Sequence, residues 1–138
     1  MWDPVGHRTN QQRLEAEQNR AARFVIGDYR RSTSISGILS ELRWDSLAER
    51  RAKAKAIMAY RILNGLVFSP SNFLNQSDTP SQTRGALYKL VIPHSRTDLY
   101  RHNFVMSVSL LWNGLPAGVT QADTLESFKA QLAGVSLH

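Results

Sequence analysis

Apolar residues recur at helical spacing through much of this chain, beginning in residues 10–26. Here an apolar stripe runs along one side of a helix, and three arginines lie away from it or beside it. The stripe consists of Leu14, Ala21, Phe24 and Val25. Gly27, followed by Asp28, predicts the end of this helix, because glycine adopts the left-handed conformation of a helix C-cap at little cost.

Two further helices are expected after short turns. Residues 34–42 carry apolar side chains at the i, i+3, i+4, i+7 spacing of a short helix. In residues 46–64, Ser46 and Glu49 form an S-x-x-E capping box that predicts the start of a longer helix, and Gly65 predicts its end. One side of this longer helix carries mostly small side chains, which let another helix approach closely. It consists of Ala48, Ala52, Ala56, Ala59 and Leu63.

The second half of the chain mixes loop signals with shorter elements. Residues 69–83 are rich in Ser, Asn, Gln, Thr and Pro, which predicts a mobile loop. Residues 87–93 form the only strand-like run. Residues 97–113 have helical periodicity, and Gly114 and Pro116 predict the end of that helix. A last helix is expected to begin near Asp123.

Together these elements predict a mainly α fold class. We expect a small helical domain of about five helices with a mobile central loop and at most one short strand or hairpin. Its parts would be an Arg-rich helical segment over residues 1–68, a linker over 69–85, and a short strand with two C-terminal helices over 86–138. The length of 138 residues is within the range of a single domain.

Positive charge is concentrated in the first half of the chain. The formal net charge is +6, and residues 1–68 carry twelve Lys and Arg against seven Asp and Glu, whereas residues 69–138 carry five against four. Thirteen of the seventeen basic residues are arginine, whose planar guanidinium suits phosphate oxygens. Such a surface attracts RNA or DNA, and a solvated basic face without a nucleic-acid partner is the alternative.

The composition also excludes several classes of protein. With zero cysteines there is no disulfide framework and no Cys-based zinc site. No apolar run approaches the ~20 residues needed to cross a bilayer. The polar N-terminus lacks the apolar core of a signal peptide. We therefore expect an intracellular protein, in the nucleus or the cytoplasm, without a membrane partner.

Catalytic and ligand-binding motifs are absent from the sequence. The four histidines match no compact metal-ligand spacing, the serines lack a G-x-S-x-G motif, and no glycine-rich phosphate-binding motif occurs. Two-metal phosphoryl transfer needs converging carboxylates, and the chain contains no Asp-Asp pair. We therefore expect no catalytic residues, no metal, no cofactor and no small-molecule substrate.

Aromatic residues next to basic ones give the remaining chemical signal. Tyr29 precedes two arginines and Tyr100 precedes one, and such sets can stack bases and hold phosphates. The alternative role is packing at the edge of a core, which we expect for Tyr60 and Trp112. For Tyr29 the sequence leaves both roles open.

Short motifs also follow one another over almost the whole chain. They are Trp2-Asp3-Pro4; Leu14-Glu15 with Gln18; the block from Arg20 to Arg31; Leu42-x-Trp44 with Leu47 and Arg50-Arg51; Tyr60-Arg61-Ile62 with Asn64 and Leu66-Val67; Thr83-Arg84-Gly85; Arg96-Thr97-Asp98 with Tyr100; Trp112-Asn113 with Leu115-Pro116; and Leu125 with Phe128-Lys129. In this order and spacing the chain resembles the C-terminal region of non-LTR (LINE-like) retrotransposon reverse transcriptases, the stretch that follows the polymerase palm.

The resemblance implies a thumb-like helical segment that catalyses nothing, because the polymerase and endonuclease sites of such proteins lie in other domains. It implies a part in binding template RNA or an RNA–DNA hybrid, and contact with the polymerase domain of a parent protein. The chain departs from the family between Phe104 and Trp112, where the usual Pro and Arg are missing. This departure lowers the positive charge of that helix.

Basic residues of the first half are the candidates for phosphate contacts. They are Arg20, Arg23, Arg30, Arg31, Arg50, Arg51, Lys53 and Lys55. One alternative is a helical interaction module that packs on the polymerase or another protein through the Ala48–Leu63 face. A degenerate retroelement remnant without independent function is a second, and an independent enzyme is a third, which the missing motifs disfavour.

Overall fold

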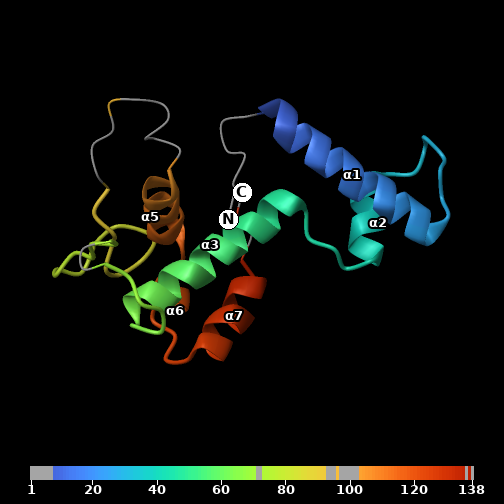
Figure 1. Cartoon of the computed structure of the whole chain (residues 1–138). Coiled ribbons are helices and arrows are strands. Elements are labelled where there is room, and N and C mark those ends of the chain that lie inside the picture. The colour runs from blue at the N-terminus through green and yellow to red at the C-terminus, as the bar shows by residue number, and fades with distance from the viewer. Residues whose placement is uncertain (1–7, 71–72, 93–95, 97–102, 136, 138) are drawn as a thin grey trace. The chain divides into compact units, whose positions relative to one another are not determined.

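The computed structural model describes residues 8–70, 73–92, 96, 103–135 and 137. In this part of the chain there are six helices, and the mainly α fold class predicted from the sequence is confirmed (Figure 1). They are α1 (Arg8–Ile26), α2 (Ile35–Glu41), α3 (Leu47–Leu63), α5 (Phe104–Gly114), α6 (Ala117–Thr120) and α7 (Leu125–Ala133). The contacts divide the chain into two compact units, the first ending at Arg51 and the second beginning at Ala52. The boundary between these units falls inside α3, and the division into residues 1–68, 69–85 and 86–138 stays a prediction from the sequence.

The first unit consists of α1, α2 and the start of α3. Helix α1 ends where the sequence predicted, since Gly27 has a φ of +73° and its N–H donates to the carbonyl of Arg23 at 2.8 Å. Helix α2 packs against α1 and buries Ile38. Helix α3 begins after Ser46, whose Oγ accepts the backbone N–H of Glu49 at 3.2 Å, as the capping pattern predicted.

Helix α1 presents its polar side to the rest of the first unit. Gln18 is buried, and its Nε2 donates to the carbonyl of Asp45 at 2.8 Å. Glu15 accepts the backbone N–H of Ala48 at 3.0 Å. The apolar stripe is consequently directed outward, with Phe24 75% and Val25 57% exposed. Hydrogen bonds to Asp45, just before α3, and to Ala48, in its first turn, therefore help to orient this helix together with its packing on α2.

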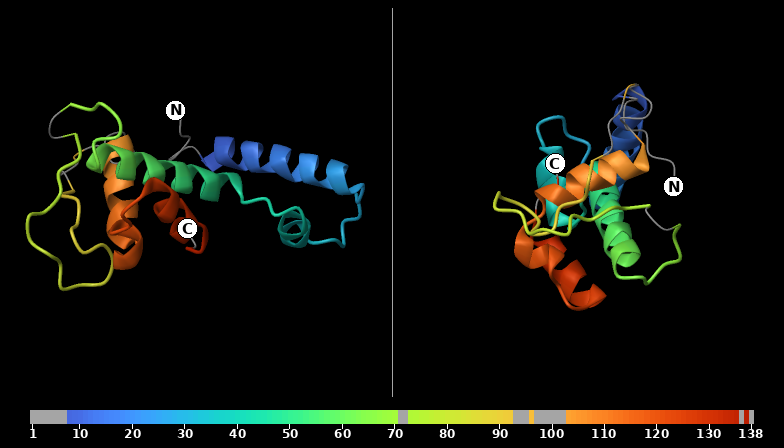
Figure 2. Two further views of the ribbon diagram at one scale, coloured as in Figure 1. Left: turned by 90° about the horizontal axis from the view of Figure 1, so that it is seen from below. Right: turned by 90° about the vertical axis from the view of Figure 1, so that its left-hand side faces the viewer.

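The core of the second unit forms around the rest of α3. Ala56, Ala59 and Tyr60 are buried together with Trp112 of α5 and Phe128 of α7, and these helices lie beside α3 (Figure 2). The ring of Phe128 stacks on Tyr60 with centroids 4.5 Å apart and on Trp112 at 5.9 Å. The packing roles expected for Tyr60 and Trp112 are confirmed. The small-residue side of α3 is thus covered by the chain's own core over these positions.

The segment 73–92 contains no strand, although the sequence suggested one at 87–93; residues 93–95 lie outside the described part. It forms an isolated antiparallel bridge between Gln76 and Leu90. Residues 87–92 bond to residues of the predicted loop, because the N–H of Ser77 donates to the backbone carbonyl of Lys89 at 2.8 Å. The side chain of Asn113 in α5 provides further bonds, accepting from the N–H of Leu90 at 2.7 Å and donating to its carbonyl at 3.0 Å.

Capping side chains mark the starts of the longer C-terminal helices. Helix α5 begins after Asn103, whose side chain accepts the N–H of Met106 at 2.9 Å, and residues 97–102 of the predicted helix lie outside the described part. The short α6 was missed, because Pro116 reads as a helix stop but here occupies the N-cap of a new turn. Helix α7 follows Thr124, which caps it through the N–H of Ser127 at 3.1 Å.

The alanine side of α3 gives a test of the second core. Ala56 is 1% exposed, so Ala56→Leu should overpack the core and lower the free energy of unfolding by about 1–3 kcal/mol. The same substitution at the exposed Ala130 of α7 should change it by less than about 0.5 kcal/mol. Urea denaturation of both variants measures the difference, and equal stabilities would contradict this packing.

Gly85 gives a second test, of the contact between segment 73–92 and α5. Its φ is +104°, and an added Cβ would overlap the backbone carbonyl oxygen of Asn113. We expect Gly85→Ala to lower the free energy of unfolding by about 2 kcal/mol or more. Gly118→Ala is the control, because a Cβ there meets no atom within 4 Å and should be neutral or slightly stabilising. A tolerated Gly85→Ala in thermal denaturation would show that the segment is not held against α5.

Candidate nucleic-acid interface

The candidate phosphate-binding residues belong to both units. Six of them lie in the first unit, and Lys53 and Lys55 lie in the second. Arg50 is exposed, and the structure records no bond for its side chain within the described residues. Arg51, Lys53 and Lys55 are half-buried and interact within the chain. Lys55 donates to Ser107 Oγ at 2.8 Å, so an internal partner already holds one of its three donors.

Arg20 lies on the outer side of α1 with its charge partly compensated. It forms an exposed i, i+3 ion pair with Glu17 at 2.9 Å, a type of pair worth only a few tenths of a kcal/mol, about 0.2–0.5. Arg13 was not among the candidates, yet it is exposed and lies two helical turns before Arg20 on the same side. The i, i+7 spacing in the sequence is the signal that could have identified it.

Arg23 braces the loop that follows α1. Its Nη1 donates to the carbonyls of Arg30 at 2.9 Å and Asp28 at 3.5 Å, and its Nη2 donates to the carbonyl of Thr33 at 3.2 Å. These bonds tie the last turn of α1 to both ends of residues 28–33. Arg23 therefore has a structural role that its sequence position did not suggest, because the contacts are to main-chain carbonyls.

We call residues 27–33 the Tyr29 loop, and the carboxylate of Asp28 holds this loop together. Oδ1 of Asp28 accepts hydrogen bonds from the backbone N–H and from Nε of Arg30, both at 3.0 Å. Oδ2 of Asp28 accepts from Arg30 Nη2 at 2.9 Å and from Thr33 Oγ1 at 2.8 Å. The side-chain bonds from Arg30, then its backbone N–H and the Thr33 hydroxyl, hold the pKa of Asp28 well below its usual range. The same carboxylate raises the pKa of the Arg30 guanidinium.

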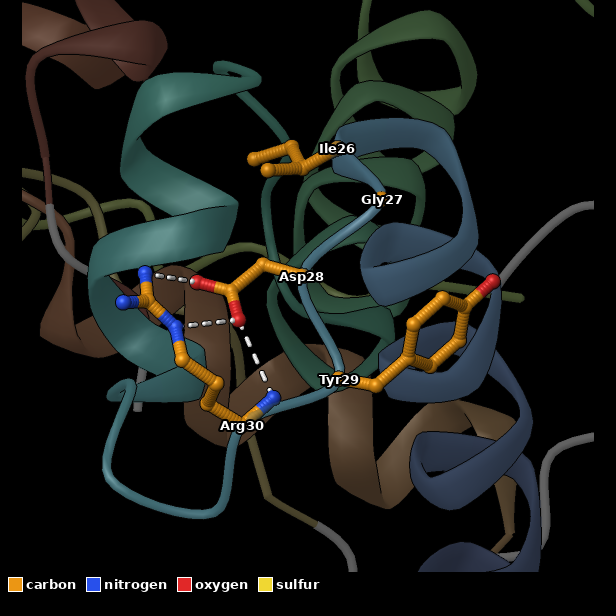
Figure 3. A pocket seen from close by; sticks show the side chains of 5 residues that line it. All are labelled: Ile26, Gly27, Asp28, Tyr29 and Arg30. Atoms are coloured by element: carbon orange, nitrogen blue, oxygen red, sulfur yellow. Dashed lines mark hydrogen bonds and ion pairs between the residues drawn. The ribbon is translucent and has the colours of Figure 1, made fainter.

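The Tyr29 loop exposes an aromatic ring between these anchors. Tyr29 is 65% exposed, and an open hollow lined by Ile26, Gly27, Asp28, Tyr29 and Arg30 lies at this place. Figure 3 shows the Arg30 guanidinium facing the Asp28 carboxylate, while the Tyr29 ring points to the other side of the chain. Arg31 follows directly and is exposed, and within the described residues no bond of its side chain is recorded. Of the two roles open to Tyr29, core packing is thereby ruled out within the first unit.

A second open hollow in the first unit lies where α1 passes the start of α3. Its polar lining consists of two arginines, three side-chain amides and one carboxylate, from Arg8, Arg51, Gln11, Gln12, Asn19 and Glu15. Amides and guanidiniums are the groups that hydrogen-bond to base edges and phosphates. The predicted residue Arg51 is therefore placed among polar neighbours from α1 that the sequence analysis did not select.

Other kinds of site receive no support from the part of the chain that the structure covers. In the described ranges, no group of three or more His, Asp or Glu side chains is placed to hold a metal ion. No helix of these ranges is long and apolar enough to cross a membrane. The Trp2-Asp3-Pro4 motif and Tyr100 lie outside the described residues.

The Tyr29 loop makes a prediction about pH. Because the pKa of Asp28 is lowered in the folded protein, its bonds stabilise the fold above the ordinary pKa of 3.8, and this contribution is lost as the pH falls through the lowered pKa. We expect an NMR titration of the Asp28 carboxyl to give a midpoint well below 3.8. Arg30→Gln should raise the midpoint more than Thr33→Val does. If the titration midpoint of Asp28 is the same in Arg30→Gln as in the wild type, the bidentate pair between Asp28 and Arg30 is ruled out.

Comparison with known proteins does not assign the chain to a family. No protein-family model, no curated protein and no solved structure matches the chain. What the chain does is therefore inferred from its own residues and from the order of its motifs.

Proposed function

We propose that this chain is a non-catalytic segment of a non-LTR retrotransposon reverse transcriptase that helps to bind template RNA or an RNA–DNA hybrid. The binding surface is the arginine-rich first unit. The observation that carries the proposal is the group of exposed arginines in that unit, next to an exposed tyrosine on a braced loop. The order of motifs that the chain shares with the family supports the wider assignment. Such a role belongs inside the cell, in the nucleus or the cytoplasm.

The charge of the first unit supports a polyanionic partner. Between residues 8 and 51 there are nine arginines against six Asp and Glu. Asp28 and Glu17 are engaged with arginines, whereas Arg13, Arg31 and Arg50 are exposed and have no recorded bond within the described residues. These guanidiniums can approach phosphates without breaking an internal contact. Each phosphate that they neutralise releases counterions, which makes the affinity depend on salt.

A protein-interaction module is the second candidate function, and α1 is the observation that favours it. The Ala48–Leu63 face was the expected docking surface, but Ala56 and Ala59 of that face are buried in the second core. The outward stripe of α1, by contrast, exposes Leu14, Phe24 and Val25. Exposed apolar side chains at helical spacing suit the groove of another protein, such as the polymerase domain of a parent chain. This candidate predicts binding that does not weaken with salt.

The nucleic-acid proposal is tested by the salt dependence of binding. Arg31 and Arg50 should be changed to Gln together, which removes two exposed charges without altering helix propensity much. If both arginines contact phosphates, the slope of log K against log[salt] should flatten by about 1.4–1.8 for a single-stranded or hybrid oligonucleotide. Fluorescence anisotropy at several salt concentrations gives the slopes for variant and wild type.

The matched control is Arg84→Gln with Arg96→Gln, which removes the same charge from exposed positions of the second unit. Its slope should stay near that of the wild type. Equal flattening in both double variants would mean that total charge, not the first unit, determines binding. If the wild-type chain binds neither RNA nor DNA, the interaction-module candidate replaces the proposal.

A further inference from the structure

Tyr29 is held in solvent on a loop that is fixed from both sides. Its ring is 65% exposed, although apolar ring surface is normally buried where a core is available. Arg23 binds the carbonyls of Asp28, Arg30 and Thr33, and Asp28 binds the N–H and side chain of Arg30 and the hydroxyl of Thr33. The chain thus uses seven hydrogen bonds to hold this loop in one conformation.

From this arrangement we infer that Tyr29 is a stacking platform for an unpaired base, so that the Tyr29 loop selects single-stranded nucleic acid. The inference rests on the proposed nucleic-acid function and narrows it to one substrate class. A base inside a duplex is already stacked on both faces, whereas an unpaired base can lie on an aromatic ring. Stacking of this kind tolerates any base, because every base has a π face.

The two arginines after Tyr29 have different roles in this inference. Arg30 forms a bidentate pair with Asp28 through Nε and Nη2, and this pair gives Arg30 a part in positioning the loop. Arg31 is exposed and has no recorded bond in the described part of the chain, which makes its guanidinium the one available to a phosphate of the stacked nucleotide. One ring for the base and one cation for its phosphate are the minimal set for a single nucleotide.

The fixed loop increases what this small site can contribute. A flexible loop would lose conformational freedom on binding, and this loss would offset the gain from stacking. Here the backbone of residues 28–33 is already ordered by Arg23 and Asp28. The open hollow at this place is lined by Ile26, Gly27, Asp28, Tyr29 and Arg30, so Tyr29 borders space that solvent fills.

The experiment compares a single strand with a duplex of the same sequence, using the full chain. A 12-nucleotide RNA carrying one 2-aminopurine reports stacking through its fluorescence, and anisotropy reports affinity. Tyr29→Ala should weaken single-strand binding about five- to hundredfold and abolish the stacking signal, while duplex binding stays the same. Tyr29→Phe should keep both, because the ring remains. Tyr88→Ala, which removes an exposed tyrosine of the second unit, should behave as the wild type.

Each result decides the inference. An unchanged single-strand affinity in Tyr29→Ala overturns it and leaves the nucleic-acid proposal in place, provided that the wild type binds with a salt-dependent slope. Equal losses for single strand and duplex also overturn it, since they would indicate damage to the loop. A wild-type chain that binds neither form overturns both proposals. Tyr29→Ala should not alter the salt slope, whereas Arg31→Gln should flatten it by about 0.7, which separates stacking from charge.

Discussion

Phe128 lies with its ring stacked on Tyr60 and on Trp112, so one residue of α7 joins α3 and α5. Ala56 and Ala59 of α3 are buried in the same cluster, and small side chains at these positions let neighbouring helices approach closely. The hydroxyl of Tyr60 completes the arrangement by donating to the carbonyl of Ala122 at 2.8 Å, just before α7. The positions of α5 and α7 in the second unit depend on this cluster.

The first unit is held together mainly by hydrogen bonds rather than by aromatic packing. Over residues 8–51, which the structure describes, its buried side chains are few, namely Gln18, Ala22 and Ile38, and long-range polar bonds accompany this small apolar core. Polar bonds have strict geometry, so they fix orientation where apolar packing is too sparse to do so. They also leave the apolar stripe of α1 directed outward. In α1, the polar side forms the contacts within the unit, and the apolar side stays exposed to a binding partner.

Much of the helical structure could be predicted from the sequence, because periodicity and caps are local signals. Gly27 and Gly65 end α1 and α3 with positive φ, as expected from glycine alone. The side of α1 that faces inward could not be predicted, because periodicity does not tell whether the partner of an apolar stripe lies in the same unit. The hydrogen bonds between Asn113 and Leu90 could not be predicted either, since they join residues 23 positions apart. In them a side-chain amide bonds the N–H and the carbonyl of Leu90, as the backbone of a neighbouring strand would.

The candidate site shows the same limit at the level of single arginines. Arg23, Arg30 and Arg31 look alike in the sequence, and only their partners distinguish a brace, a compensated pair and an exposed cation. Asp28 creates this difference, because its carboxylate takes up the charge of Arg30 and leaves that of Arg31 to the solvent. Counting basic residues therefore overstates the charge available to a phosphate. The ordered backbone of the loop lowers the entropy lost on binding, so one exposed arginine and one exposed aromatic residue on the same braced loop can contribute to recognition out of proportion to their number.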